Sequence, residues 1–309
     1  MRLGFPVHVF GCPDLPAHDA RRWPDRPHLS VSLARLRDIL CYLQANDLHM
    51  YRMHARLLPR PLACREGRLD LAECEAQLAL LGELAGRADV RLSFHAPGSL
   101  VLNARNEEQA DAATAWLASW AALLDAMGQG PEAVIVLHVG GVYDSVQASI
   151  DRFCRRFDAL PLWVQSRLAL EQDDRRFGYC EVLAIHRRCG LPLVFDNLHH
   201  QVLNPGRVPF LEALRGALST WPAGVVPKVH FSSPRTEMRV RSGASRVQPP
   251  SWTEHSDLVN PFEFISFLEG CQGLPDLDIL IEARARDLAV LRLRQDLRRF
   301  APELVPLVC

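Results

Sequence analysis

Short apolar segments alternate with longer amphipathic segments along the whole chain. In the first long segment, Leu33, Leu36, Leu40 and Leu43 recur at steps of three and four residues, the spacing of a helix face that packs on a core. Strands that alternate with helices predict parallel pairing through right-handed crossovers. The eight expected strands lie at 2–9, 49–53, 90–95, 134–139, 167–171, 191–196, 227–232 and 278–282.

The segments between these strands are the expected helices. They lie at 31–45, 69–86, 107–127, 144–163, 179–188, 209–218, 261–269 and 284–299. Eight strand–helix units in about 300 residues predict an α/β fold, a (β/α)8 TIM barrel that forms one domain over residues 1–309. A doubly wound open sheet is the alternative.

Composition is that of an ordinary globular protein, and it restricts the function classes. Hydrophobic residues make up 48% of the chain, which excludes a mainly disordered protein. The formal net charge is −1, so nucleic-acid binding would depend on local basic patches. The nine Cys form no C-x-x-C pair, which favours a reducing compartment. Without a signal-peptide pattern or a membrane-spanning segment, we expect a cytoplasmic monomer with no membrane partner.

Six consecutive predicted strands end at or near a His, Glu or Asp. The carboxyl ends of the strands form the active-site face of a (β/α)8 barrel. Singly, such a residue is often a satisfied core His or an acid that caps the next helix. Together they would repel or stay unpaired unless cations offset them. The candidate metal ligands are His95, His138, Glu171, Asp196, His199, His230, His255 and Glu282, with His200 as a weaker alternative to its neighbour.

This ligand set indicates the kind of metal centre. Imidazoles and carboxylates without thiolate suit Mn, Zn, Fe or Mg. About eight ligands are too many for one ion, so we expect two or three divalent ions, bridged by Glu171, Asp196 and Glu282. Clustered ions about 3.5–4 Å apart hydrolyse phosphodiesters by activating water and neutralising the developing charge.

Lys228 is the single lysine of the chain, because every other strong base is Arg. An amine can lose its proton in suitable surroundings, whereas a guanidinium keeps it. We therefore interpret Lys228, on the seventh strand, as a candidate catalytic residue beside Glu171 and Glu282. Chance survival of one lysine is the alternative.

Two loops are locally basic, and the barrel would place both on the same rim. The first, 13–27, carries Arg21, Arg22, Trp23 and Arg26, and the second, 233–250, carries Arg235, Arg239, Arg241 and Arg246 against only Glu237. We expect these loops to contact DNA phosphates, with Arg235 and Arg239 as the named contacts. Solvated loops in an Arg-rich protein are the alternative.

A series of motifs runs through nearly the whole chain in the order of one known family. The motifs are RLGF, YRM with LLP, SFHAPG, VLHVGG, LALEQDD, PLVFDNLHH, PKVHFSS, EHSD and IEAR. In this order the chain resembles the UV damage endonucleases, TIM-barrel repair nucleases related to apurinic-site endonucleases and sugar isomerases.

The resemblance implies a three-metal site, usually described with Mn²⁺, on the eight ligands given above; Zn²⁺ or Mg²⁺ are alternatives. Lys228 matches the family's metal-site lysine, which can be carboxylated and then serve as a ligand. The implied substrate is double-stranded DNA with a lesion, such as a UV photoproduct. The strand would be nicked immediately 5′ to the damaged base, which leaves a 3′-hydroxyl.

Several positions depart from the family pattern, mostly in the part that recognises damage. Phe5 replaces a Tyr, and Val9 stands where a polar residue is usual. After His95, the family's Gln-Tyr-like wedge is replaced by Ala-Pro-Gly-Ser-Leu at 96–100, and the family's E-A-K on strand eight ends in Arg284 here. We expect Ser99 and Leu100 to contact DNA, with Leu100 as an apolar wedge.

Two other functions stay open on the sequence. A sugar isomerase or epimerase would use the same scaffold with one or two ions and a closed pocket, and the basic loop after the seventh strand favours the nuclease over it. A barrel that binds DNA or metal without turnover is the second alternative. The complete ligand set argues against this alternative, because a protein that had lost turnover would be expected to lose some of its ligands.

Overall fold

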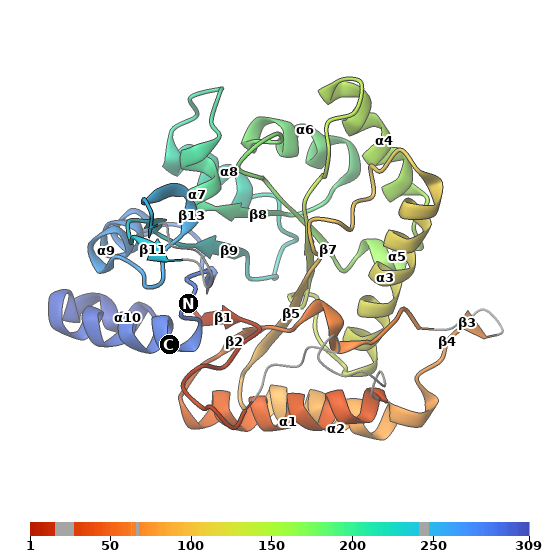
Figure 1. Cartoon of the computed structure of the whole chain (residues 1–309), viewed down its shortest axis with the longest axis horizontal. Coiled ribbons are helices and arrows are strands. Elements are labelled where there is room, and N and C mark those ends of the chain that lie inside the picture. Colours follow the sequence, from red (N-terminus) through yellow and green to blue (C-terminus); the bar gives the residue numbers. More distant parts are fainter. Residues whose placement is uncertain (16–27, 63, 66–67, 241–246, 309) are drawn as a thin grey trace.

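Eight parallel strands close into a barrel in the computed structural model of this chain (Figure 1). The structure describes residues 1–15, 28–62, 64–65, 68–240 and 247–308. Around the barrel the strands follow the order β1 (Leu3–Pro6), β14 (Asp278–Ile281), β9 (Lys228–Phe231), β8 (Leu193–Asp196), β7 (Leu168–Glu171), β6 (Ile135–Leu137), β5 (Arg91–His95) and β2 (Met50–Arg52). Because β1 pairs with both β2 and β14, the sheet has no edge. The predicted (β/α)8 barrel is confirmed and the open sheet is excluded.

Helices surround the strands on the outside of the barrel (Figure 1). The predicted apolar stripe of the first helix is buried, with Leu33, Leu36, Leu40 and Leu43 facing the core. In the described part of the chain, no helix combines the length and the apolar character that a membrane span requires. The helices are α1 (Leu29–Ala45), α2 (Glu75–Arg87), α3 (Glu107–Ala126), α4 (Val146–Asp158), α5 (Leu162–Gln165), α6 (Tyr179–Cys189), α7 (Asn197–Val202), α8 (Phe210–Leu218), α9 (Pro261–Gly270) and α10 (Asp287–Phe300), with 3₁₀ turns at Ala55–Leu57, Ala72–Cys74 and Pro302–Leu307.

Three connections differ from the sequence-based expectation. The helix expected at 144–163 is divided into α4 and α5, because Pro161 has no N–H to continue the first helix. The helix expected from residue 69 begins only at Glu75, after a 3₁₀ turn and the short hairpin of β3 (Cys64–Arg65) and β4 (Arg68–Leu69). The connection after β9 contains two antiparallel pairs, β10 (Pro234–Arg235) with β13 (Ser251–His255) and β11 (Arg239–Val240) with β12 (Val247–Gln248).

Closure of the barrel requires a glycine at the contact between β1 and β2. A Cβ on Gly4 would lie 1.9 Å from the carbonyl oxygen of Met50, inside the backbone of the neighbouring strand. Since backbone cannot give way as a flexible side chain does, only glycine fits there. The glycine of the RLGF motif therefore has a structural role in joining the first two strands.

The barrel interior is filled by alternate residues of each strand, as the period of two requires. An apolar layer of Val136, Ala169 and Val194 packs with Trp221. Two residues further along these three strands stand His138, Glu171 and Asp196. The strand alternation that fills the lower barrel therefore also directs the polar strand ends inward.

A buried ion pair lies near the amino ends of the strands. Arg91 Nη1 lies 3.0 Å from Asp278 Oδ2, and both side chains are almost completely excluded from solvent. Asp278 also accepts from the backbone N–H of Arg2 at 2.9 Å. The Arg91 guanidinium lies over the Trp221 ring, 5.5 Å from its centroid. These contacts join three strands at the end of the barrel opposite the candidate metal ligands.

Candidate metal centre

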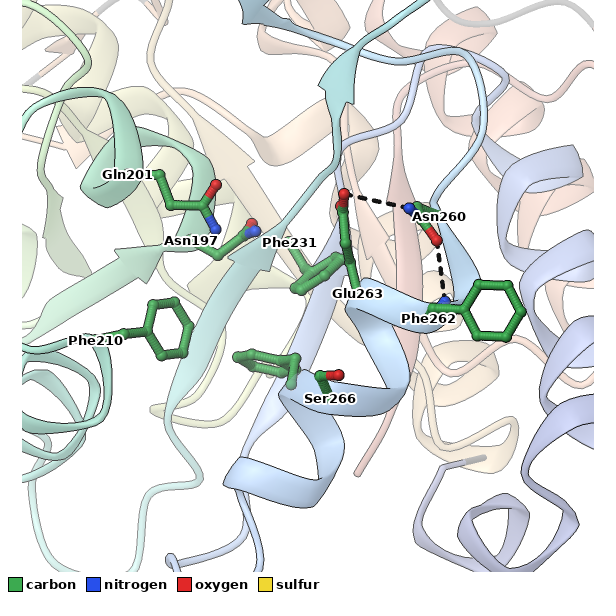
Figure 2. A pocket seen from close by; sticks show the side chains of 9 residues that line it. Asn197, Gln201, Phe210, Phe231, Asn260, Phe262, Glu263 and Ser266 are labelled. Carbon is green, nitrogen blue, oxygen red and sulfur yellow. Dashed lines mark hydrogen bonds between the residues drawn. The ribbon is translucent and has the colours of Figure 1, made fainter.

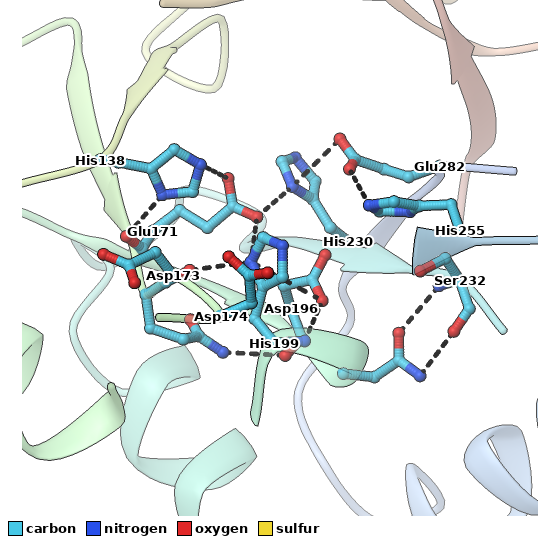
Figure 3. A network of polar contacts seen from close by, with 12 residues as sticks. His138, Glu171, Asp173, Asp174, Asp196, His199, His230, Ser232, His255 and Glu282 are labelled. Carbon is cyan, nitrogen blue, oxygen red and sulfur yellow. Dashed lines mark hydrogen bonds and ion pairs between the residues drawn. The ribbon is translucent and has the colours of Figure 1, made fainter. Parts of the chain in front are cut away.

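Seven of the eight predicted ligands lie together at the carboxyl ends of the strands, and Figure 3 shows all of these except His95. They form three overlapping groups in which one ligand atom from each residue lies within 4.8 Å of the others. Glu171 and Asp196 each belong to two groups, so each carboxylate would be able to contribute to two sites if cations bind. The groups are His95 with His138 and Glu171, Glu171 with Asp196 and His199, and Asp196 with His230 and Glu282.

Glu171 lies at the centre of the cluster, at the end of β7. Its Oε2 lies 2.8 Å from His95 Nε2, and its Oε1 lies 2.9 Å from His230 Nδ1. The more distant nitrogens are His138 Nε2 at 3.6 Å and His199 Nδ1 at 3.4 Å. Burial alone would raise the pKa of this carboxyl group, but the surrounding imidazoles, His230 first, hold the pKa of Glu171 well below its usual range. Glu171 is therefore a carboxylate, the form that binds cations.

Backbone carbonyls orient two of the imidazoles. His95 Nδ1 lies 2.8 Å from the carbonyl oxygen of Ala96, and His138 Nδ1 lies 3.2 Å from that of Glu171. Burial lowers the pKa of both rings, which favours the neutral form. If Nδ1–H is donated to the carbonyl, Nε2 is the nitrogen of each ring that would bind a cation. A metal ion is the usual partner of such an arrangement.

Asp196 and His230 carry buried polar atoms that lack partners. Asp196 Oδ1 accepts from the backbone N–H of His199 at 2.8 Å, which caps α7, whereas its Oδ2 has no hydrogen-bond partner among the described residues. Burial raises the pKa of Asp196, and the carboxylates of Glu171 and Glu282 raise it further. His230 Nε2 is also buried without a partner within the described ranges. Such unsatisfied atoms are costly unless a cation offsets them, so this donor set fits divalent ions.

His255 and Glu282 form the outer side of the cluster. His255, on β13, has its Nε2 3.8 Å from Glu282 Oε2, and it belongs to none of the three groups found in the described residues. Glu282 also forms an ion pair with Arg52, at the end of β2. Burial would raise the pKa of Glu282, but Arg52 and His230 hold it well below its usual range. Arg52 lies in the YRM motif, and the sequence alone predicted no role for it.

The choice between two adjacent histidines is decided by the turn of α7. His199 faces the cluster, where its Nδ1 lies 2.9 Å from the carbonyl oxygen of Gln172. His200 Nε2 lies 3.0 Å from the carbonyl oxygen of Val208, and its ring packs on Phe195 with centroids 5.2 Å apart. Consecutive helical residues point in directions about 100° apart. The structure therefore brings His199 into the cluster of candidate ligands and His200 into the packing outside the barrel.

Lys228 points into the barrel beneath the cluster. Its Nζ donates to Ser93 Oγ at 3.0 Å, and the side chain is completely buried. Burial lowers the pKa of this amine well below its usual range, and the positive charges of Arg52 and Arg91 lower it further. It lies two residues before His230 on β9, and its role as a catalytic residue or ligand stays a prediction. Carboxylation of Lys228 stays a prediction.

The basic loop after β9 differs from its expected form. Arg235 is buried, with its Nε 2.9 Å from Glu254 Oε2, so its guanidinium is not exposed for DNA phosphates as we expected. Arg239 Nη2 lies 2.7 Å from Asp257 Oδ1, which offsets its charge. The antiparallel pairing of β10 with β13 brings Glu254 close to Arg235. The other expected bases of both loops, Arg21, Arg22, Arg26, Arg241 and Arg246, lie outside the described residues, as does Trp23.

Two adjoining cavities open at this face of the barrel. The first, of about 340 Å³, is lined by six of the eight predicted ligands, together with Arg52, His54 and Pro97. The second, of about 300 Å³, is lined by Ser99, Leu100 and Trp116, and it shares Ala55 and Pro97 with the first. Leu100 therefore lies in a cavity that adjoins the candidate ligands. Phe5, in contrast, is buried against Tyr51 with ring centroids 5.5 Å apart, and Val9 is buried as well.

A third cavity, of about 480 Å³, lies between α7, α8 and α9 and belongs to none of the ligand groups (Figure 2). Two of its polar side chains make local contacts: Asn260 Oδ1 accepts from the N–H of Phe262 at 3.1 Å, and Glu263 Oε2 accepts from Ser233 Oγ at 2.5 Å. Phe210, Phe231 and Phe267 form its apolar wall. The contact between Ser233 and Glu263 joins α9 to the connection after β9.

Comparisons with known proteins agree with this geometry. The UV DNA damage endonuclease of Bacillus velezensis is 32% identical over 277 residues, which cover 87% of this chain and 82% of that protein. The crystal structure of SacUVDE matches with a TM-score of 0.77 and 26% identity, over 97% of this chain and 98% of that one. D-psicose 3-epimerase from Clostridium cellulolyticum H10 matches with a TM-score of 0.58 and 10% identity, over 86% of this chain and 92% of that one, which shows the shared fold alone.

The family comparison covers most of the same region. The model of the family described as UV-endonuclease UvdE matches residues 29–306, which include each of the eight predicted ligands and Lys228. The barrel, the cluster at its carboxyl end and this match together show that the chain belongs to the UV-endonuclease UvdE family.

Proposed function

We propose that this protein is a metal-dependent DNA repair endonuclease that nicks the phosphodiester backbone 5′ to a damaged base. The observation that carries the proposal is the overlap of three ligand groups through Glu171 and Asp196. An epimerase site needs one or two ions, whereas this donor set has room for three. The relatives named UV DNA damage endonucleases support the same function and double-stranded DNA with a lesion as the partner.

The residues of the cluster have distinct parts in this function. Glu171 and Asp196 would each be shared by two ions, and His95 and His138 would bind through the nitrogens that backbone carbonyls leave free. Bound divalent ions would supply a hydroxide nucleophile and would neutralise the charge of the phosphate in the transition state. Arg52 holds the Glu282 carboxylate at the rim of the cavity, where its positive charge faces the incoming phosphodiester.

The donors also restrict the choice of metal. The groups contain imidazole and carboxylate atoms and no thiolate among the described residues, which suits Mn²⁺, with Zn²⁺ or Mg²⁺ as alternatives. We propose two or three Mn²⁺ ions as the cofactor.

The proposed nuclease activity predicts a result with plasmid DNA. The purified protein with Mn²⁺ should convert UV-irradiated supercoiled plasmid to the nicked circle, and excess EDTA should abolish the conversion. Non-irradiated plasmid is the control and should stay supercoiled. Gel electrophoresis measures the conversion, and end-labelled duplexes locate the cut. Failure to nick irradiated plasmid with any of the three metals would refute the proposed function, and epimerisation of a ketose by the same preparation would support the alternative.

Leu100 is proposed as the apolar wedge at the lesion, because it lines the cavity that adjoins the ligands. Leu100→Ala should lower the rate of nicking on a lesion duplex about tenfold, equivalent to about 1.4 kcal/mol, because less apolar surface enters the kinked step. Single-turnover kinetics measure this rate. Leu80→Ala, at an exposed leucine of α2, is the matched control. Wild-type rates for Leu100→Ala would show that Leu100 is not a wedge.

A further inference from the structure

A cavity of about 400 Å³ adjoins the metal centre and contains three arginines. It shares Arg52, His255 and Glu282 with the cavity over the metal ligands, so the two are neighbouring parts of one surface. The residues that belong to this side alone include Thr253 from β13 and Arg284 and Arg286 from the connection between β14 and α10. We call this cavity the arginine cavity.

The arginines of this cavity differ in whether they form an ion pair. Arg52 pairs with Glu282, and Arg284 Nε lies 3.7 Å from Asp257 Oδ1. Glu254, the other acid of the cavity, is engaged by Arg235 at 2.9 Å and by Arg239 at 3.5 Å. Arg286 forms no ion pair with any residue that the structure describes, and its Nε is buried without a hydrogen-bond partner there. Among the described residues, the arginine cavity therefore has one half-buried positive charge that forms no ion pair.

The backbone of Arg286 is also strained. It has φ 56° and ψ −123°, a conformation that favours glycine. Arg286 occupies the N-cap position of α10, where its side chain makes no capping hydrogen bond. Burial and the nearby Arg52 lower the pKa of this guanidinium, and only Glu282 opposes them. Strain and an unpaired charge both oppose folding, and such combinations are typical of residues that bind a ligand.

We propose that Arg286 binds a backbone phosphate of the DNA strand next to the one that reacts at the metal centre, with Arg284 and Thr253 beside it. The proposal rests on the proposed nuclease function, because that function supplies the anion. A guanidinium presents paired donors that match phosphate oxygens, and partial burial strengthens the attraction. The shared wall of Arg52, His255 and Glu282 places this site beside the reacting phosphodiester, as consecutive phosphates of one strand require. Free inorganic phosphate has the same chemistry, so the experiment separates the two sources.

The test compares Arg286→Gln with Arg286→Lys, which keeps the charge. Equilibrium binding of a lesion duplex is measured in EDTA over a series of salt concentrations. For Arg286→Gln we expect about tenfold weaker binding and a slope of log K against log salt that is shallower by about 0.9, the effect of one lost phosphate contact. Arg286→Lys should keep the wild-type slope. In nicking assays with Mn²⁺, Arg286→Gln should raise the half-saturating duplex concentration about tenfold with less than a threefold change in the maximal rate.

Two controls separate binding from structure. Arg188→Gln, in the last turn of α6, removes an arginine paired with Asp151 and should leave duplex binding unchanged. Arg286→Gln should not lower the unfolding temperature, because the charge that it removes has no partner in the described structure. A wild-type salt slope for Arg286→Gln would overturn the proposal, and so would a lost affinity that a fall in unfolding temperature fully explains.

The outcomes also separate this proposal from the proposed function. If the wild type nicks irradiated plasmid while Arg286→Gln keeps the wild-type slope, the phosphate site is wrong and the nuclease stands. If the wild type neither binds lesion duplex nor nicks irradiated plasmid with metal, both fail. If inorganic phosphate binds the wild type and not Arg286→Gln, while both bind duplex equally, the site takes free phosphate and the assignment to the DNA strand is overturned.

Discussion

Glu171→Gln should abolish nicking and reduce the bound metal. Glu171 is shared by two of the three ligand groups, and its carboxylate lies within 3.6 Å of imidazole nitrogens from four histidines. An amide of the same size cannot bridge two cations, so we expect the nicking rate to fall by about 10³-fold or more. That loss would exceed the 10- to 100-fold effect of a residue that only orients a ligand. Elemental analysis of the metal-loaded protein and single-turnover nicking measure the two effects.

Glu108→Gln, in the first turn of α3, is the matched control and should keep both metal and activity. Glutamine needs no more space than the carboxylate, so we expect Glu171→Gln to fold normally. Circular dichroism checks this and so separates a chemical effect from misfolding. Nicking by Glu171→Gln at the wild-type rate would remove Glu171 from the chemistry, and an unchanged metal content would remove it from the ligands.

Asp278→Asn should destabilise the protein by about 3–5 kcal/mol, because it leaves the buried Arg91 guanidinium without its anion. Arg91 and Asp278 are both almost fully excluded from solvent, and Asp278 holds Arg2 as well. Neither the metal ligands nor their cavity lies at this end of the barrel, so metal content per folded protein should stay unchanged. Urea unfolding measures the difference in free energy.

An exposed pair provides the comparison for this substitution. Asp151→Asn removes the contact with Arg188 on the outer helices, where solvent screens the charges, and the urea midpoint should not move. Equal midpoints for Asp278→Asn and the wild type would show that Arg91 finds another partner. In that case the Arg91–Asp278 pair would not be needed to join the strands at their amino ends.

The hydrophobic pattern alone was sufficient to predict much of the fold. The leucine stripe of α1 and the apolar strand segments predicted the barrel correctly, because side-chain periods of 3.6 and 2 are local properties. The helix expected at 144–163 was wrong in extent because Pro161 interrupts it. The basic loop was predicted from net charge, and the structure corrects it, since pairing across a hairpin brings Glu254 beside Arg235.

For the site, the order of amino acids was enough to predict which side chains stand at the ends of the strands. Side chains alternate along a strand, so Glu171 and Asp196 point into the barrel like the residues two positions before them. How these residues meet could be learned only from the folded barrel. Its geometry selects His199 over His200, and it pairs Arg52 with Glu282 across 230 residues of sequence. Distances between strand ends depend on barrel closure and register, and no local pattern contains that information.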